Sequence, residues 1–62
     1  SYSLSTTDCY EILASAFYLM KRDKISSIVD LVKVTALEKQ KFSEQQINWV
    51  ISQKKGYFEI NG

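Results

Sequence analysis

A stripe of apolar side chains, spaced three or four positions apart, runs through the first third of the chain. This spacing places the side chains on one face of an α-helix and predicts a helix from about Thr7 to Arg22. Two overlapping capping boxes compete for its start, Ser5 with Asp8 and Asp8 with Glu11, and the pattern does not choose between them. The stripe consists of Cys9, Ile12, Leu13, Ala16, Phe17 and Met20.

A second stripe begins close to Ser27, which forms a capping box with Asp30. The residues from Ile28 to Val34 are rich in β-branched side chains, which lower helix propensity, so a strand over Ile28–Val34 is the alternative. We favour a helix because its cap is good and the stripe continues beyond these residues, with an end between Val34 and Gln40. The stripe consists of Ile25, Ile28, Val29, Val32 and Ala36.

A third helix is predicted between Phe42 and Gly56, with its own start and stop signals. Ser43 and Gln46 form a capping box at its start. Gly56 stands where a left-handed residue would end the helix, directly after two lysines that suit a helix C-terminus. The apolar face of this helix consists of Ile47, Val50 and Ile51.

The ends of the chain carry strand patterns. Tyr57 to Ile60 is rich in β-formers, and Tyr2 to Ser5 alternates apolar and polar side chains. We therefore expect a mainly α, three-helix domain spanning residues 1–62, with a short C-terminal strand that pairs with the N-terminal segment. The order of helix, helix, helix and strand has the outline of a winged helix. The predicted core consists of Ile12, Leu13, Phe17, Met20, Ile28, Val32, Ile47, Val50 and Ile51.

Length and composition fit one small globular domain. The 62 residues are 45% hydrophobic and 24% charged, and a chain of this size has a thin core. The net charge of +1 argues weakly against a dedicated nucleic-acid binder. Cys9 is the only cysteine, so no internal disulfide forms, and we expect a cytoplasmic protein. No apolar run predicts a membrane span or a signal peptide. Because the chain starts at Ser1 without an initiator methionine, we expect it to be processed or excised from a longer protein.

The residue types needed for common catalytic and metal sites are missing. The chain has no histidine, which excludes Ser-His and Cys-His nucleophile pairs, and one cysteine cannot build a zinc site. Gly56 and Gly62 are the only glycines, so no phosphate-binding loop is present. The carboxylates are dispersed, and Cys9 is expected to be a buried apolar side chain. We expect neither an enzyme nor a protein with a cofactor, a metal or a small-molecule substrate.

Trp49 points to a binding surface. It lies two residues from Ile47, so at about 100° per residue it faces roughly away from the apolar side of the third helix. Tryptophan is enriched at interface hot spots, and we expect a protein-interaction domain that binds another protein or a second copy of itself as a homodimer. The competing interpretation is that Tyr57, Phe58 or the N-terminal segment covers Trp49 within the chain. The expected protein-binding residues are Trp49, Gln45, Gln46, Ser52, Gln53 and Tyr18.

The alternative function is a winged-helix-like DNA-binding domain of a transcriptional regulator or a replication protein. It requires a second helix shortened to Ser27–Val34, so that the third helix becomes a recognition helix with outward amides for base edges and lysines for phosphates. The near-neutral charge, the missing second wing strand and the glycine-free turn before Ser43 argue against it. The expected DNA-binding residues are Gln45, Asn48, Ser52, Lys39, Lys41, Lys54 and Lys55.

Overall fold

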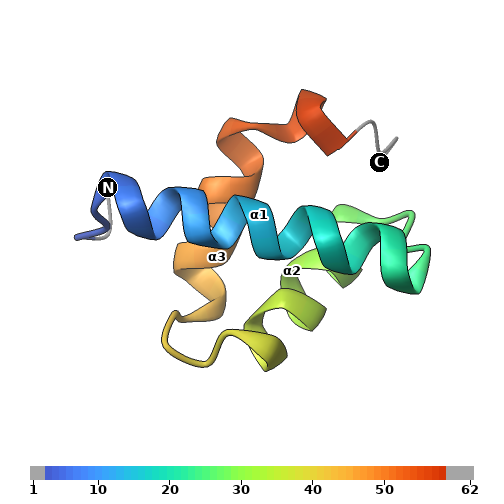
Figure 1. Cartoon of the computed structure of the whole chain (residues 1–62), viewed down its shortest axis with the longest axis horizontal. Helices are drawn as coiled ribbons and strands as arrows, with labels where there is room; N and C mark the ends of the chain where they lie inside the picture. The colour runs from blue at the N-terminus through green and yellow to red at the C-terminus, as the bar shows by residue number, and fades with distance from the viewer. Residues whose placement is uncertain (1–2, 59–62) are drawn as a thin grey trace.

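The computed structural model describes residues 3–58, which form three α-helices and one short 3-10 helix. Figure 1 shows α1 along the length of the molecule, with α2 on one side and α3 crossing behind it, so that η1 lies on the other side of α1. Each of the three helices packs against the other two. No helix within residues 3–58 is both long enough and apolar enough to cross a membrane. The elements are α1 Thr6–Asp23, α2 Ile28–Glu38, α3 Glu44–Gln53 and η1 Lys55–Phe58.

The helix starts follow the capping signals in the sequence. The Oγ of Ser5 accepts a hydrogen bond from the Asp8 N–H at 3.0 Å, and the Asp8 carboxylate accepts one from the Ser5 N–H at 3.2 Å. This reciprocal box settles the start of α1 in favour of Ser5. Ser43 and Gln46 form the same arrangement at the start of α3, with distances of 3.1 and 2.9 Å. Each box satisfies backbone donors that the first turn of a helix leaves unpaired.

The segment with many β-branched residues is helical, and the alternative strand over Ile28–Val34 is not formed. Its start is capped by Ser27, whose Oγ accepts from the Asp30 N–H at 3.4 Å. Packing outweighs the lower propensity of these residues, because the helical period buries Leu31 and Thr35 together on one face. The helix continues to Glu38, so the short helix over Ser27–Val34 that the DNA-binding alternative requires is absent.

The end of α3 differs from its predicted stop signal, whereas α1 ends at Asp23, one residue after the predicted Arg22, and α2 ends at Glu38, within the predicted range. The left-handed cap occurs at Lys24 (φ 53°, ψ 45°), whose N–H donates to the carbonyl of Met20. α3 ends at Gln53, and its cap Lys54 has φ −121°, so the predicted left-handed cap at Gly56 is wrong. Gly56 lies inside η1 instead. The physical reason is the docking of Phe58, which is 3% exposed and brings the chain back over the helices.

The predicted C-terminal strand is also wrong where the structure describes it. Tyr57 and Phe58 belong to η1, and no strand occurs within residues 3–58. Residues 1–2 and 59–62, over which the rest of the expected ribbon falls, lie outside the described residues. The three helices and the mainly α class are confirmed, whereas the winged-helix outline loses its strand over the described chain.

The core forms where the three helices meet under η1. Leu13 and Met20 pack against it half-buried, but Phe17 is 41% exposed, so its placement in the core is wrong. Phe17 lies at the margin of a wide stripe, where its ring meets that of Phe58 at a centroid distance of 5.4 Å. The buried apolar residues are Ile12, Ala16, Leu19, Ile28, Leu31, Val32, Phe42, Ile47, Val50, Ile51 and Phe58.

Candidate protein-interaction surface

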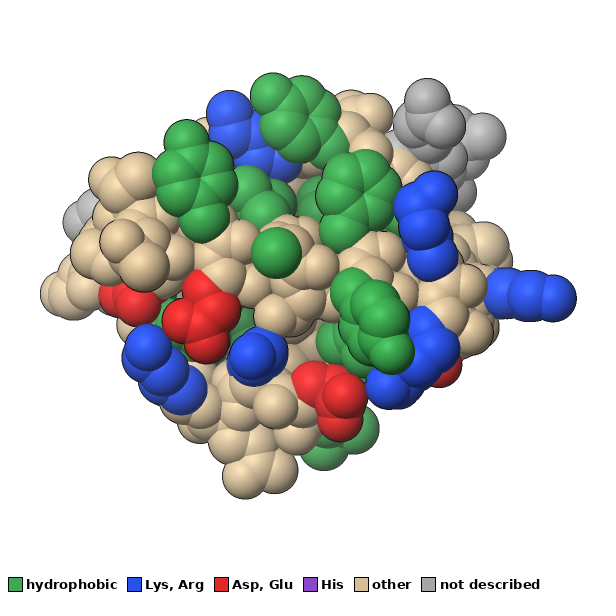
Figure 2. All heavy atoms as spheres, in the orientation of Figure 1, with side chains coloured by type: hydrophobic (Ala, Val, Ile, Leu, Met, Phe, Trp, Pro, Cys, Tyr) green, Lys and Arg blue, Asp and Glu red, His purple; other side chains and the backbone are tan. Residues whose placement is uncertain are grey.

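α1 carries a second apolar stripe, on the side that faces away from the core. Tyr10 is 68% exposed, Tyr18 is 63% exposed and Phe17 is 41% exposed. With Ala14, which is also exposed, they follow the spacing i, i+4, i+7 and i+8 and therefore share one helix face. Figure 2 shows hydrophobic side chains gathered over α1 and toward η1. α1 is thus apolar on two sides, and the fold covers one of them.

A groove of about 290 Å³ lies beside this stripe, between α1 and α3. Leu13 lies in the groove and belongs to the same helix surface as Tyr10 and Phe17, which are three and four residues away. At the other end, Lys54 also contacts Tyr57, which is 64% exposed. The groove is lined by Cys9, Leu13, Trp49, Val50, Gln53 and Lys54.

The exposed rings lie around the groove. Tyr10 and Phe17 adjoin it through Leu13 on the surface of α1, and Tyr57 adjoins it through Lys54. Together they form a surface that joins the outer side of α1 to the end of α3 and to η1, which are far apart in the sequence but adjacent in the fold. We call this surface the aromatic face. It consists of Tyr10, Leu13, Phe17, Trp49 and Tyr57.

Trp49 is half-buried and packs against the core, so the prediction that it faces away from the apolar side of α3 is only partly right. Its large ring lies beside Cys9 and Leu13, which form the edge of α1 across the groove. Cover within the chain is the competing interpretation of the sequence, but it is assigned there to Tyr57, Phe58 or the N-terminal segment. The contribution of α1 is not predicted, because helical periodicity describes one helix at a time. The position of a neighbouring helix decides how far a large ring is covered.

The predicted neighbours of Trp49 do not all gather around it. Gln53 lines the groove with Trp49, whereas the side-chain Oε1 of Gln46 accepts a hydrogen bond from the Ser43 N–H in the cap of α3. Tyr18 lines a different hollow with Glu38 and Lys39, and Gln45 lines a third one with Asn48 and Val29. Ser52 is exposed. Tyr18 therefore does not extend the patch around Trp49, although it belongs to the outer stripe of α1.

Lysines lie against two rings of the aromatic face. The Nζ of Lys21 is 5.8 Å from the centre of the Phe17 ring, and that of Lys54 is 5.5 Å from the centre of the Tyr57 ring. Within residues 3–58, neither lysine forms an ion pair with an acidic side chain. Ammonium groups over ring faces are weakly attracted by the ring quadrupole, so these charges are held beside the aromatic face.

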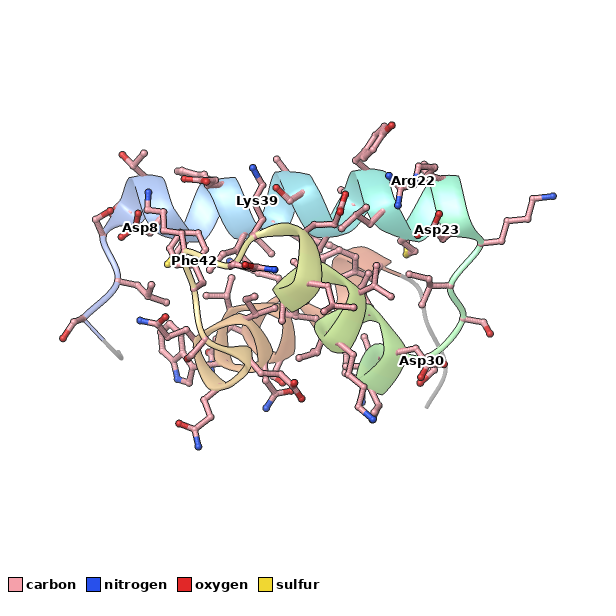
Figure 3. All side chains as sticks on the ribbon, turned by 90° about the horizontal axis from the view of Figure 1, so that it is seen from below. Asp8, Arg22, Asp23, Asp30, Lys39 and Phe42 are labelled. Atoms are coloured by element: carbon pink, nitrogen blue, oxygen red, sulfur yellow. The ribbon has the colours of Figure 1, made fainter. Side chains whose placement is uncertain are left out.

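The ion pairs of the described residues lie on the other side of α1, toward α2 and the turn before α3. Figure 3 shows Asp8 at one end of α1, Arg22 and Asp23 at the other, and Lys39 between them. The pairs are Lys41 with Asp8 and Glu11 at 3.6 and 3.4 Å, Lys39 with Glu11 at 3.7 Å, and Arg22 with Asp23 and Glu38 at 2.8 and 3.6 Å. Three basic and four acidic side chains pair here, whereas the aromatic face is bordered by lysines.

Two carboxyl groups have a lowered pKa. The Ser5 backbone N–H, together with the Ser5 hydroxyl and Lys41, holds the pKa of Asp8 below its ordinary value. The hydrogen bond from Arg22 lowers the pKa of Asp23, and the same contact raises the pKa of the Arg22 guanidinium. These shifts follow from a helix cap and a surface ion pair. They do not mark a reactive group.

The residues expected to bind DNA are separated in the fold. Gln45, Asn48 and Ser52 are exposed along α3, and Lys54 and Lys55 are exposed at its end. Lys39 and Lys41 instead pair with carboxylates of α1.

Comparison with family models, with curated proteins and with solved structures found no match to this chain. Among residues 3–58, no three acidic or cysteine side chains come together as a metal ligand set. Function is therefore inferred from the surface described above.

Proposed function

We propose that this chain is a non-enzymatic protein-interaction domain that binds another polypeptide through the aromatic face. The observation that carries the proposal is that three exposed rings, Tyr10, Phe17 and Tyr57, lie around an apolar groove. Small monomeric proteins rarely leave large contiguous apolar patches exposed, and such patches are typical of interaction sites. The single cysteine is free, which fits a reducing compartment, and we include the cytoplasm in the proposal.

The energy available at this face suits a moderate interface. Fully burying one large apolar side chain contributes about 1.5–3 kcal/mol, and Tyr10 and Tyr57 are each about two-thirds exposed. Burying both rings against a partner thus contributes a few kcal/mol (about 2–4 kcal/mol) before the cost of association. Interfaces commonly obtain most of their affinity from such small clusters of aromatic residues.

The DNA-binding alternative has weaker support. Two of its four lysines, Lys39 and Lys41, are held by the carboxylates of Asp8 and Glu11. Its recognition helix also needs a shorter second helix than the one over Ile28–Glu38. The exposed amides of Gln45 and Asn48 remain in its favour, but polar residues on an outer helix face are ordinarily just solvated.

A peptide-display selection tests the proposal even though the partner is unidentified. Peptides that bind the wild-type domain are selected from an unconstrained random library. Their affinity is then measured for two variants. Tyr10→Ser/Tyr57→Ser removes two rings of the aromatic face, and Leu37→Ser removes an equally exposed apolar side chain of α2, at 70% exposure. Circular dichroism of both variants is used to check that they are folded.

The selected peptides are expected to bind the Leu37→Ser control as they bind wild type and to lose at least about tenfold in affinity for the double variant, which corresponds to about 1.4 kcal/mol. Chemical shifts in ¹⁵N-labelled protein should move at Leu13, Phe17 and Trp49. Peptides that bind all three proteins equally, or a selection that yields no binder, would contradict the proposal.

A further inference from the structure

We infer that the partner segment is an acidic amphipathic helix, whose apolar side chains fill the groove and whose carboxylates meet Lys21 and Lys54. This inference rests on the proposed function and adds the chemistry of the partner. Helices of this kind commonly dock in apolar grooves through anchors at i, i+3 or i+4, and i+7. The charges around the aromatic face and the lining of the groove both favour such a partner.

The charges around the face are unbalanced. Lys21 and Lys54 stand on either side of it, each against an aromatic ring and neither paired with an acid within residues 3–58. Figure 2 shows the acidic side chains of this view in the lower half of the molecule, whereas most of the hydrophobic groups gather in the upper half. Each lysine is close to its ring in the sequence, Lys21 four residues after Phe17 and Lys54 three residues before Tyr57, so local spacing holds both charges at the aromatic face. A partner with carboxylates at its rim complements this arrangement.

The lining of the groove favours a polypeptide over a nucleic acid. Leu13 and Val50 present aliphatic surface beside the indole of Trp49, and the polar lining is limited to Gln53 and Lys54. A volume of about 290 Å³ accommodates an aliphatic or aromatic anchor side chain. A nucleotide base inserted into this groove would find few hydrogen-bond partners for the polar groups on its edge. Burying polar groups without partners is unfavourable.

The charges also argue against a second copy of the chain as the occupant. An isologous dimer places the same patch of both subunits together. Such a pairing brings Lys21 and Lys54 of one copy close to those of the other. The α1 carboxylates of Asp8, Glu11 and Asp23 are already paired with Lys41, Lys39 and Arg22. An acidic partner from a different protein removes this repulsion.

Three helical peptide libraries with different charges test the inference. Each library randomises the same apolar positions, at i, i+3, i+4 and i+7 of a helix-favouring scaffold, and fixes Glu, Gln or Lys at the outward positions. Equal amounts of the three are selected together on the wild-type domain. Some of the selected peptides will lose binding to the Tyr10→Ser/Tyr57→Ser variant and therefore bind the aromatic face. We expect most of these face-dependent peptides to come from the Glu library. The inference is overturned if the face-dependent peptides come equally from all three libraries, or mainly from the Gln or Lys library.

Charge-reversal variants supply the matched control. Lys21→Glu/Lys54→Glu should weaken binding of the selected Glu peptides by about tenfold at low salt, and less at high salt because surface charges are screened. The matched comparison is between single reversals. Lys33→Glu, at an exposed position of α2, should change the affinity less than about twofold, and Lys21→Glu and Lys54→Glu should each weaken binding more than this. Equal losses in the three single variants would show that only net charge matters and would overturn the inference.

The remaining occupants are separate outcomes of the same experiment. Sedimentation equilibrium that shows a wild-type dimer abolished by Tyr10→Ser would assign the face to a second copy. Displacement of the peptides by a single-stranded oligothymidine would assign it to nucleic acid. Face-dependent binders from the unconstrained library, but none from the Glu library, would overturn the acidic helix and leave the interaction function standing. No face-dependent binder from either library would overturn both.

Discussion

Two adjacent residues of η1 separate the folding role of this segment from its binding role. Phe58 is 3% exposed and its ring meets that of Phe17 at 5.4 Å, whereas Tyr57 is 64% exposed. We predict that Phe58→Ala strongly lowers the free energy of unfolding and that Tyr57→Ala leaves it nearly unchanged. Because the two positions are neighbours, differences in chain entropy or in local helix content do not explain a contrast between them.

The magnitude follows from burial. Truncating a buried phenylalanine to alanine costs about 3–5 kcal/mol, and we expect the lower end for Phe58 because a terminal segment relaxes more readily than the centre of a core. A domain of this length has a total stability of about 3–9 kcal/mol, so Phe58→Ala would remove a large part of it. Tyr57→Ala exposes no core, and it loses a cation–π contact with Lys54 worth about 0.5–1 kcal/mol at an exposed site.

Urea denaturation checks this prediction, followed by circular dichroism and by the fluorescence of Trp49, the only tryptophan. The two probes should give one transition in wild type and in Tyr57→Ala. The reasoning would be refuted by a loss below about 1 kcal/mol for Phe58→Ala, because a docked phenylalanine cannot be removed so cheaply. It would equally be refuted by losses of similar size in both variants.

Three further predictions concern the fold. The Thr35 hydroxyl is buried with no hydrogen-bond partner among the described residues. Thr35→Val removes this hydroxyl and should raise the free energy of unfolding by about 1 kcal/mol in urea denaturation. Thr35→Ser keeps the hydroxyl and should not raise the free energy of unfolding. Lys24 adopts the left-handed conformation, so Lys24→Gly should raise the thermal midpoint through a gain of about 0.5–1 kcal/mol. The pKa of Asp8 is lower in the folded chain than its ordinary value of 3.8. The ionised Asp8 carboxylate therefore stabilises the folded state above that pH, and this stabilisation is lost as the pH falls further. Asp8→Asn, but not Ser26→Ala, should remove this acid dependence in pH-resolved urea titrations.

Local chemistry makes the helix starts predictable, whereas the end of α3 depends on tertiary docking and is predicted wrongly. A capping box such as that of Ser43 and Gln46 is complete within four residues, so its signal is contained in the sequence. The end of α3 depends on Phe58, which lies beyond the helix and is buried by contact with other elements. The glycine rule places the left-handed cap at Gly56, but the chain uses Lys24, where no glycine is available to signal it.

The candidate site is only partly predictable for a related reason. Trp49 stands out by its mismatch with the apolar face of α3, and the structure places it in a groove. The outer stripe of α1 is visible as Tyr10, Phe17 and Tyr18 at helical spacing, but the pattern alone assigns Phe17 to the core and Tyr18 to a polar side. A helix with two apolar faces does not reveal which face the other helices cover, because that choice depends on the shape of the whole core.

Phe17 connects folding and binding in this domain. Its ring packs on Phe58, carries Lys21 above it and is 41% exposed, so it belongs both to the margin of the core and to the aromatic face. A partner that covers Phe17 also covers the contact that holds η1 in place, and binding should therefore raise the apparent stability of the domain by mass action. Changes at Tyr10 should affect binding alone and changes at Phe58 mainly folding. Phe17→Ala should weaken both, and this shared effect follows from one ring that serves two surfaces.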